Sequence, residues 1–436
     1  MAAAGKAPAP NGTPDGAPGG TLRAAAAVIV GSALEWYDFF LYGLLVGSVM
    51  TVNFFPNVDR SVATIAAFAT FAIGFLARPL GGMLLANLSD RFGRKQVLVG
   101  ILFLTGGSSF LMGLLPTYAH VGIAAPLALM VLRILQGVGA GAEYAVAAVY
   151  AVESGPDARR GLRGAYPAAG LYLGLLLASG ALAVFSKWAG PDFVHWGWRI
   201  PFLLSGLLLV AGFWIRRHLA ESATFEQARA THTLLRHPTR ELLRREWRGV
   251  AFVAGAQCAQ AGLGYLYLTF AIYYITDVLG MGRAVALQGT WLAAAVAMVT
   301  APLFGAWADR IGTRRFFIGA LVFCLLGGLA YFPMLNTRNP WLIALSMVFA
   351  IGIGVNALLA VQGALYSAPF PAAMRTSGVA LGRELSTAIV GGLAPLVATV
   401  LLQRYGPSGV AALAAGLTLL SLATVLVSRH AGMRPD

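Results

Sequence analysis

A short charged loop occurs twice in this chain, almost half the chain length apart. The first copy is Ser-Asp-Arg-Phe-Gly-Arg-Lys at Ser89–Lys95, and the second is Ala-Asp-Arg-Ile-Gly-Thr-Arg at Ala308–Arg314. Each copy joins two long apolar segments, and Asp90 and Asp309 occupy the same place in both. The repeat predicts two homologous halves, each a bundle of membrane helices, which is the plan of a transporter that rocks one half against the other.

The composition places most of the chain inside a membrane. Of 436 residues, 58% are hydrophobic and only 11% are charged, which is unlike a soluble protein. A helix needs about 20 mostly apolar residues to cross lipid. Twelve such stretches occur, at approximately 24–50, 62–87, 97–115, 124–152, 162–186, 199–219, 249–276, 285–307, 314–334, 341–367, 376–402 and 407–428. Without sustained strand-like alternation, the predicted fold is an all-α membrane protein with twelve transmembrane helices in two pseudo-symmetric six-helix bundles.

The charged residues predict the orientation and the division of the chain. Of 31 Lys and Arg residues, 22 lie in tails and loops on one side of this twelve-helix map, and six lie on the other side. The positive-inside rule then places both termini in the cytoplasm, and the net charge of +14 implies no nucleic-acid partner. The predicted parts are a disordered cytoplasmic tail at 1–22, a six-helix bundle at 23–215, a polar cytoplasmic linker at 216–248, a second six-helix bundle at 249–429 and a cytoplasmic tail at 430–436.

The sequence indicates neither a metal site nor an enzyme active site. The two cysteines, Cys258 and Cys324, fall inside predicted spans, without the spacing of a disulfide framework or of metal ligands. No His accompanies a Ser or an Asp within a span. We therefore expect no enzyme, no metal and no cofactor, and we expect a monomer whose partners are the lipid bilayer and a small molecule.

Four short motifs resemble those of a known family. The repeated loop fits the pattern Gly-x-x-x-Asp-Arg-x-Gly-Arg-Lys, with Ala86 in place of the leading Gly and Gly305 keeping it in the second copy. The other motifs are Gly-Ser-Ala-Leu-Glu-Trp-Tyr-Asp-Phe-Phe-Leu-Tyr-Gly at Gly31–Gly43, Phe-Leu-Ala-Arg-Pro-Leu-Gly-Gly at Phe75–Gly82 and Trp-Arg-Ile-Pro-Phe at Trp198–Phe202. Together they resemble the major facilitator superfamily, and within it the metabolite:proton symporter branch, which includes carriers of shikimate, α-ketoglutarate, citrate and proline/betaine. Ala66–Phe71 and Glu221–Glu226 look most similar to the shikimate-type carriers.

This resemblance implies a function and a location. A chain of this kind is expected to be a secondary active transporter that imports a small organic acid, hence a carboxylate, or a zwitterionic metabolite through alternating access. Symport with a proton, the coupling ion, is expected; an uncoupled or antiporting carrier of the same fold remains open, as does a nutrient sensor that does not transport. The 28 Arg against 3 Lys are typical of a GC-rich bacterial genome, and the expected location is the bacterial inner membrane.

Ionisable side chains at the centre of a span are costly, so they are candidates for function. The chain has seven: Glu35, Asp38, Arg78, Arg133, Glu143, Arg383 and Glu384. All six His residues lie in loops, in tails or at the ends of spans. If protons cross here, carboxylates and not imidazoles must carry them.

The first span carries two acids three residues apart. Glu35 and Asp38 lie on one face of the helix, with Tyr42 one turn further along. Two carboxylates this close resist ionising together, so at least one of them can exchange a proton. We expect both to take part in proton coupling. The alternative is that Asp38 pairs with a buried Arg and only locks helices together.

Arg133 begins a stripe of small residues in the fourth span. Gly137 and Gly141 follow at i+4 and i+8, which allows a neighbouring helix to come close beside a buried cation. The stripe resembles the superfamily's helix-4 pattern Arg-x-x-x-Gly-x-x-x-Gly, whose Arg is linked to proton transfer, and Gln136 and Glu143 also match the branch. The expected proton-coupling residues are therefore Glu35, Asp38, Arg133 and Glu143. Arg133 offers a carboxylate a bidentate geometry that Lys would not. The alternative is that Arg133 forms a structural ion pair with Asp38 or Glu143.

The second half contributes polar residues from two spans. Arg383 and Glu384 stand where the branch commonly has Tyr-Asn. Adjacent residues point about 100° apart on a helix, so they are not expected to face one partner: one would line the central cavity and the other would reach a neighbouring helix. Gln260 and Tyr265 suit a cyclic or hydroxylated acid, although such tyrosines also serve in packing. The predicted substrate-binding residues are Tyr42, Arg133, Gln136, Gln260, Tyr265, Arg383 and Glu384.

Charges around the two loops are expected to latch the halves together when the cavity faces outward. Exposed ion pairs contribute only about 0–1 kcal/mol each, so a network or a contact with a helix end is needed. The alternative is that these charges only set the topology. The predicted gating residues are Asp90, Arg91, Arg94, Lys95, Glu153, Arg160, Asp309, Arg310, Arg314 and Arg375. A structural role is expected for Arg78, Pro79, Gly137 and Gly141.

Overall fold

The computed structural model describes residues 18–57, 59–153, 157–217, 226–227 and 238–428, and within these ranges it contains helices and no strand. Residues 1–17 of the predicted N-terminal tail, most of the predicted linker and all of the predicted C-terminal tail lie outside the described residues. The first helix begins at Pro18, so it extends into the segment predicted as a tail.

The first half of the chain forms six long helices. Their bounds are α1 Pro18–Leu45, α3 Arg60–Phe92, α4 Arg94–Leu114, α6 Ala124–Glu153, α8 Tyr166–Ala189 and α9 Arg199–Arg217. Short elements join them: η1 Val46–Met50, α2 Thr51–Phe54, α5 Tyr118–Val121, η2 Asp157–Arg159, α7 Arg160–Gly164 and η3 Gly190–Phe193. Pro79 lies inside α3.

The second half is built from helices that are interrupted by π-helical turns, the wider turns that are frequent at functional sites. After α11 Pro238–Arg245, the seventh span comprises α12 Trp247–Tyr265, η4 Leu266–Phe270, α13 Ala271–Tyr273 and η5 Tyr274–Val278. The eighth and ninth are α14 Arg283–Ile311 and α15 Thr313–Asn336. The tenth comprises α16 Pro340–Met347, η6 Val348–Val355, α17 Asn356–Ala360 and α18 Gln362–Ser367. The last elements are η7 Ala372–Met374, α19 Arg375–Ser386, η8 Thr387–Gly391 and α20 Gly392–Val427.

The described residues contain nine helical segments that are long and apolar enough to cross a membrane. One of them, Ala372–Val427, has a non-helical residue at Gly406 (φ 66°), where the chain turns between two helices. Two further spans are the shorter apolar helix Arg199–Trp214 and the segment that begins with α12. The twelve helices predicted from hydropathy are therefore present.

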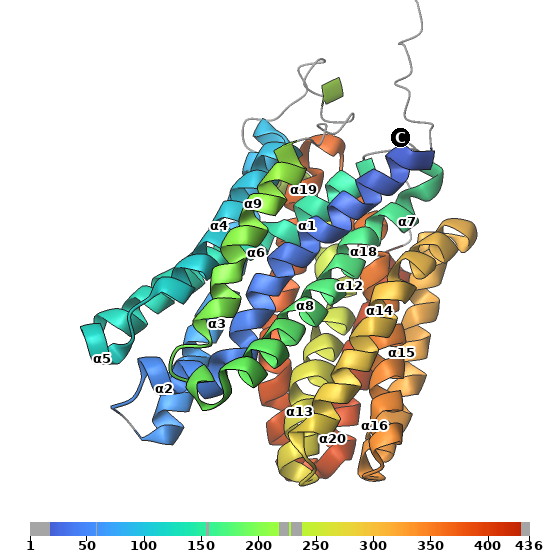
Figure 1. Ribbon diagram of the computed structural model, residues 1–436. Helices are drawn as coiled ribbons and strands as arrows, with labels where there is room; N and C mark the ends of the chain where they lie inside the picture. The colour runs from blue at the N-terminus through green and yellow to red at the C-terminus, as the bar shows by residue number, and fades with distance from the viewer. Residues whose placement is uncertain (1–17, 58, 154–156, 218–225, 228–237, 429–436) are drawn as a thin grey trace, which may run out of the picture.

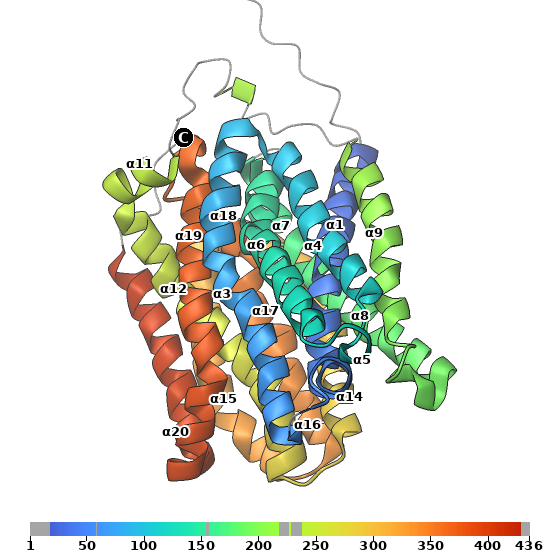
Figure 2. The ribbon, with the colours of Figure 1, turned by 90° about the vertical axis from the view of Figure 1, so that its left-hand side faces the viewer.

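The two halves lie side by side, the first in blue to green and the second in yellow to red (Figures 1 and 2). Within the first half α1 packs on α8 and α3 packs on α6, and within the second half α12 packs on α20. Across the interface α3 and α6 contact α19, while α7 and α8 contact α14. Figure 2 shows α3 beside α19 along much of their length. The second span of each half therefore packs on the fifth span of the other half.

The contact between α3 and α6 depends on glycine. A Cβ atom added at Gly137 would lie 2.0 Å from the carbonyl oxygen of Gly74, and one added at Gly141 would lie 2.0 Å from that of Arg78. Real Cβ atoms do not approach so closely, so the two backbones are in direct contact along the predicted stripe. This contact fixes Arg78 and Arg133 on neighbouring helices.

The two copies of the charged loop end their helices in the same way. The N-terminal end of α1 and the C-terminal end of α20 lie at one end of the molecule, where α3 joins α4 and α14 joins α15 (Figure 1). The joining residues are Gly93 (φ 110°) and Gly312 (φ 91°), in a region of backbone conformation that favours glycine. The sequence repeat is thus a structural repeat.

Candidate functional site

All seven ionisable residues predicted at the centres of spans are buried inside the protein. None of them exposes more than 4% of its surface. They come from α1, α3 and α6 of the first half and from α19 of the second half. The carboxylates therefore do not face lipid, and charges from both halves are enclosed together.

The guanidinium group of Arg133 is held by aromatic rings and not by an acid. Its Cζ atom lies 4.2 Å from the ring centre of Tyr42 and 5.0 Å from that of Phe71. It donates to the side chain of Gln136 and to the carbonyl oxygen of Phe71 (3.3 Å), while its Nε atom has no hydrogen-bond partner. The alternative of an ion pair with Asp38 is therefore not realised: in the described structure this cation has no carboxylate partner. A buried, uncompensated cation is a place where an anion can bind.

Asp38 lies behind α1, against α4 and α9. Its carboxylate accepts a hydrogen bond from the Ser205 hydroxyl, and the Ser109 hydroxyl lies nearby. A Cβ atom on Gly106 would lie 3.3 Å from its Oδ2 atom, which shows how closely α4 covers it. No Lys or Arg in the described ranges forms an ion pair with Asp38, so it is a buried acid held by hydroxyl groups. Glu35 is near enough for the two carboxylates to repel each other.

Gln136 connects these two unpaired charges. Its Oε1 atom accepts from Arg133, and its Nε2 atom donates to the backbone oxygen of Asp38 (3.2 Å) and to the Ser109 hydroxyl (2.7 Å). Gln136 therefore ties the guanidinium group to the backbone of Asp38 and to a hydroxyl beside its carboxylate. Sequence reasoning missed Ser109 and Ser205, because a single hydroxyl in an apolar helix has no pattern to mark it.

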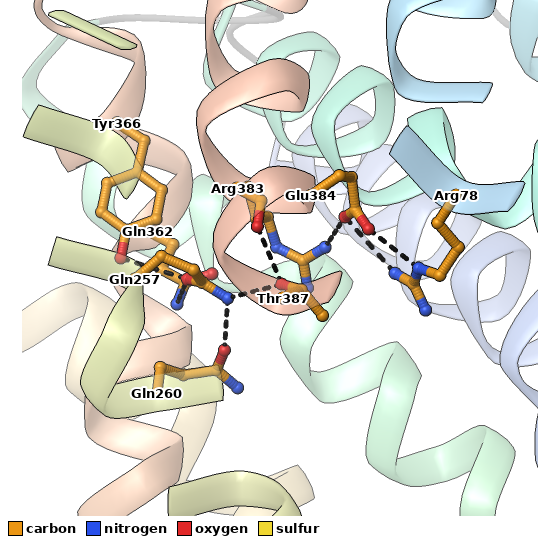
Figure 3. Close-up of polar contacts among 8 residues, drawn as sticks. All are labelled: Arg78, Gln257, Gln260, Gln362, Tyr366, Arg383, Glu384 and Thr387. Carbon is orange, nitrogen blue, oxygen red and sulfur yellow. Dashed lines mark hydrogen bonds and ion pairs between the residues drawn. The ribbon is translucent and has the colours of Figure 1, made fainter. Parts of the chain in front are cut away.

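Arg78, Arg383 and Glu384 meet at the interface between the halves (Figure 3). The Nε atom of Arg78 lies 2.8 Å from Oε2 of Glu384, and its Nη2 atom lies 3.3 Å from Oε1. Arg383 donates to the same Oε1 atom. One residue of the pair was expected to reach a neighbouring helix, and Glu384 does so, at Arg78 of α3. Arg383 contacts Glu384 itself, because both side chains are long enough to curl together. Arg78, predicted as structural, is thus half of an ion pair that joins α3 to α19.

A group of amides and hydroxyls lies beside Arg383 in the second half (Figure 3). Gln257 donates to Gln260 (2.8 Å) and to the hydroxyl of Thr387 (3.3 Å), and it accepts from Gln362 (2.8 Å) and Tyr366 (3.2 Å). Among the predicted residues Gln260 belongs to this group. Gln362, Tyr366 and Thr387 were missed, although an amide such as Gln362 inside an apolar run is a signal that could have been used.

Other predicted residues lie around these two centres. Tyr265 is close enough to Arg78, Arg383 and Glu384 for their charges to act on its hydroxyl, and its ring packs on Phe75 of the first half with 5.5 Å between ring centres. Glu143 is buried on α6, which contacts both α3 and α19. The described residues hold no group of three or more His, Cys, Asp or Glu that could bind a metal ion.

The first copy of the charged loop holds the start of a helix in the opposite half. Oδ2 of Asp90 accepts from the backbone nitrogen (2.9 Å) and the hydroxyl (2.8 Å) of Ser377, in the first turn of α19. Arg94 lies 3.3 Å from Asp90 and 3.4 Å from Glu153, and Arg375 lies 3.1 Å from Glu153. Four buried charges from both halves are therefore linked in one network.

The second copy of the charged loop, in the second half, holds the start of a helix in the first half. Oδ1 of Asp309 accepts from the backbone nitrogen of Gly161 (2.6 Å), and Oδ2 accepts from that of Leu162 (2.9 Å), at the start of α7. The other predicted gating residues lie on the same loops and helices. Arg91 and Arg310 are exposed, Lys95 donates to the backbone of Arg217, Arg314 donates to the backbone of α20, and Arg160 begins α7.

Comparison with known proteins agrees with this architecture. A family model described as Major Facilitator Superfamily matches residues 28–383. The shikimate transporter of Escherichia coli (strain K12) is 33% identical over 386 residues, which cover 88% of this chain and 88% of that protein. The proline/betaine transporter of Salmonella typhimurium (strain LT2) is 30% identical over 398 residues, which cover 88% of this chain and 78% of that protein. The proton:xylose symporter XylE, solved with 6-bromo-6-deoxy-D-glucose, is similar in fold, with a TM-score of 0.74 at 18% identity over 93% of this chain and 94% of that one.

These matches confirm the fold predicted from the sequence and the resemblance to metabolite carriers. They also identify the chain as a transporter and not an enzyme. The chain is a multi-pass membrane protein that belongs to the Major Facilitator Superfamily, among its metabolite transporters.

Proposed function

We propose that this transporter imports a small organic acid together with a proton, through alternating access. The observation that carries the proposal is a pair of buried charges in the first half, each lacking an ionic partner: Arg133 and Asp38. Burying an unpaired charge is costly, and such residues in membrane proteins mark ion and substrate pathways. The cost is removed when each charge receives a partner from outside the chain.

In the proposed cycle the partners are a cargo carboxylate and a proton. The carboxylate binds the Arg133 guanidinium in a bidentate manner, and a proton from the outer aqueous phase neutralises the carboxylate of Asp38 or Glu35. Gln136 lies between the two sites, since it accepts from the Arg133 guanidinium and donates to the backbone oxygen of Asp38. The loaded carrier then has fewer uncompensated charges to carry through the change of conformation.

The contacts made by Asp90 and Asp309 keep one end of the molecule closed in this conformation. We take this end as cytoplasmic, because the basic loops lie there, so that both termini are in the cytoplasm of a bacterial cell and the protein is a monomer in its inner membrane. Opening this end requires both contacts to break. The names of the relatives, a shikimate transporter and a proline/betaine transporter, support an organic acid or a zwitterion as cargo.

The proposal is tested in vesicles that contain the purified protein, with a membrane-impermeant pH-sensitive dye in the external medium. Shikimate, proline and glycine betaine are added outside in turn, without an imposed gradient. Inward symport makes the external medium more alkaline when, and only when, the cargo is added. In a second arm, with an inward proton gradient imposed, cargo accumulates above the external concentration and a protonophore abolishes this accumulation. External acidification would indicate an antiporter, and uptake without a pH change an uncoupled carrier. Binding without uptake would favour a sensor.

A further inference from the structure

We propose that Arg78 and Arg383, one from each half, form a carboxylate subsite whose resting occupant is Glu384, and that this subsite selects an acid without a fixed positive charge over a betaine. The inference deepens the proposed function and rests on it for the cargo being a small metabolite. It concerns a centre separate from Arg133, which lies in the first half alone.

The geometry of the triad is that of two cations that share one carboxylate. Glu384 receives hydrogen bonds from Arg78 at both oxygen atoms and from Arg383 at one of them. Each arginine keeps an unused nitrogen atom: Nη1 of Arg78 and Nε of Arg383 are buried without hydrogen-bond partners. The two buried guanidinium groups, each with a free donor, can bind a cargo carboxylate in place of the Glu384 carboxylate. The cargo carboxylate has the same charge and shape as that of Glu384.

The aromatic rings around the triad argue against a cationic cargo group. Quaternary ammonium groups are recognised by the faces of aromatic rings. Three rings face the Arg78 guanidinium at 5.5 to 5.7 Å: Trp36, Phe39 and Phe75. The ring of Tyr144 lies 4.2 Å from the Cζ atom of Arg383. These faces are therefore already occupied by the cations of the chain, and a betaine would bring its own cation against two guanidinium groups.

The surroundings of Arg383 suit the uncharged part of such an acid. Gln257, Gln260 and Thr387 lie beside it in one hydrogen-bonded group, with amide and hydroxyl atoms that can pair with hydroxyl groups of a cargo (Figure 3). Glu384 also links the two halves, because its ion pair with Arg78 joins α19 to α3. Exchange of Glu384 for a cargo carboxylate would loosen that tie, so binding at this subsite is coupled to movement of the halves.

The experiment is chemical rescue in the purified full-length chain. Glu384→Ala leaves the two guanidinium groups without their carboxylate, so we expect its melting temperature to fall by several degrees. Acetate should restore it, while sodium chloride or glycine betaine at the same concentration should not, each additive being corrected by its effect on the wild type. Adding Arg383→Gln to this variant should abolish the rescue. If the alanine variant does not fold, Glu384→Ser, which also leaves space for acetate, takes its place. No acetate-specific stabilisation in the variant that folds would overturn the subsite.

Selectivity is measured separately, by equilibrium binding to the wild-type protein. The monocarboxylates shikimate, lactate and benzoate are compared with the zwitterions glycine betaine and proline. We expect at least one acid to bind about tenfold more tightly than either zwitterion. A zwitterion that binds as tightly as the best acid would overturn the selectivity. Neither failure bears on the proton-coupled transport, which the vesicle assay decides on its own.

Discussion

The buried charges of the first half and those at the interface between the halves are organised in opposite ways. Arg133 and Asp38 are kept apart by Gln136, and neither has an ionic partner in the described structure. Arg78 and Arg383 instead share Glu384 across the interface. Separate charges can each accept a partner during a transport cycle, whereas paired charges hold one arrangement of the two halves until a carboxylate from outside takes the place of Glu384. The same residue types therefore serve two tasks, which are set by whether a counter-ion is built in.

The largest expected effect comes from removing the unpaired cation. Arg133→Gln should weaken binding of the transported acid about 100-fold, equivalent to about 3 kcal/mol, because it removes the charge that lies unpaired in the site. Arg133→Lys should recover only part of this loss, since Lys keeps the charge but not the planar fork that stacks on Tyr42. Affinity is measured by equilibrium binding. Arg91→Gln, at an exposed arginine, is the matched control and should bind normally.

Equal losses in the Arg133 variants and in the exposed control would contradict this comparison, as would full affinity in Arg133→Gln. In the second case the built-in triad, and not the unpaired cation, would hold the cargo. The two centres would then exchange their assigned tasks.

The unpaired acid gives the second prediction. Asp38→Asn keeps the hydrogen bond from Ser205 but cannot take up a proton, so accumulation against a gradient should fall to passive equilibration. Exchange of labelled for unlabelled cargo across the vesicle membrane should continue, because it needs no net movement of protons. The melting temperature shows whether folding is retained. Undiminished accumulation by this variant would refute the proton role.

Sequence reasoning identified the elements of both centres but not their connections. The twelve helices and the seven buried charges were predictable because lipid imposes long apolar segments and makes every interior charge costly. That Arg78 would pair with Glu384, more than 300 positions away, depends on tertiary packing and leaves no local pattern. The side chains of Ser109 and Ser205 were missed for the same reason, since an isolated hydroxyl can also bond to its own helix.

The smallest effects are expected at the two loop contacts that close one end of the interface, where the comparison between the halves can be sharpened. Asp90→Asn and Asp309→Asn each remove a negative charge from the start of a helix in the opposite half, which costs about 1 kcal/mol. The loss at Asp90 should be the larger, because Asp90 also pairs with Arg94. The rate of hydrogen exchange is measured at the backbone amides of 160–164 and 375–379. It should increase about fivefold in Asp309→Asn, the variant with the smaller loss, and by more in Asp90→Asn.

The distribution of that increase distinguishes two kinds of motion. If the halves rock as rigid bodies, breaking either contact favours the open state, so exchange rises at both helix starts in both variants. If each contact opens locally, Asp309→Asn affects the amides of Gly161 and Leu162 alone, and Asp90→Asn affects only those around Ser377. Arg310→Gln changes an exposed neighbour of Asp309 and should alter neither. Asp90 contacts α19 and Asp309 contacts α7, so a single substitution can raise exchange at both helices only through movement of the whole interface. A rise at both sites would therefore show that the two copies of the loop act together.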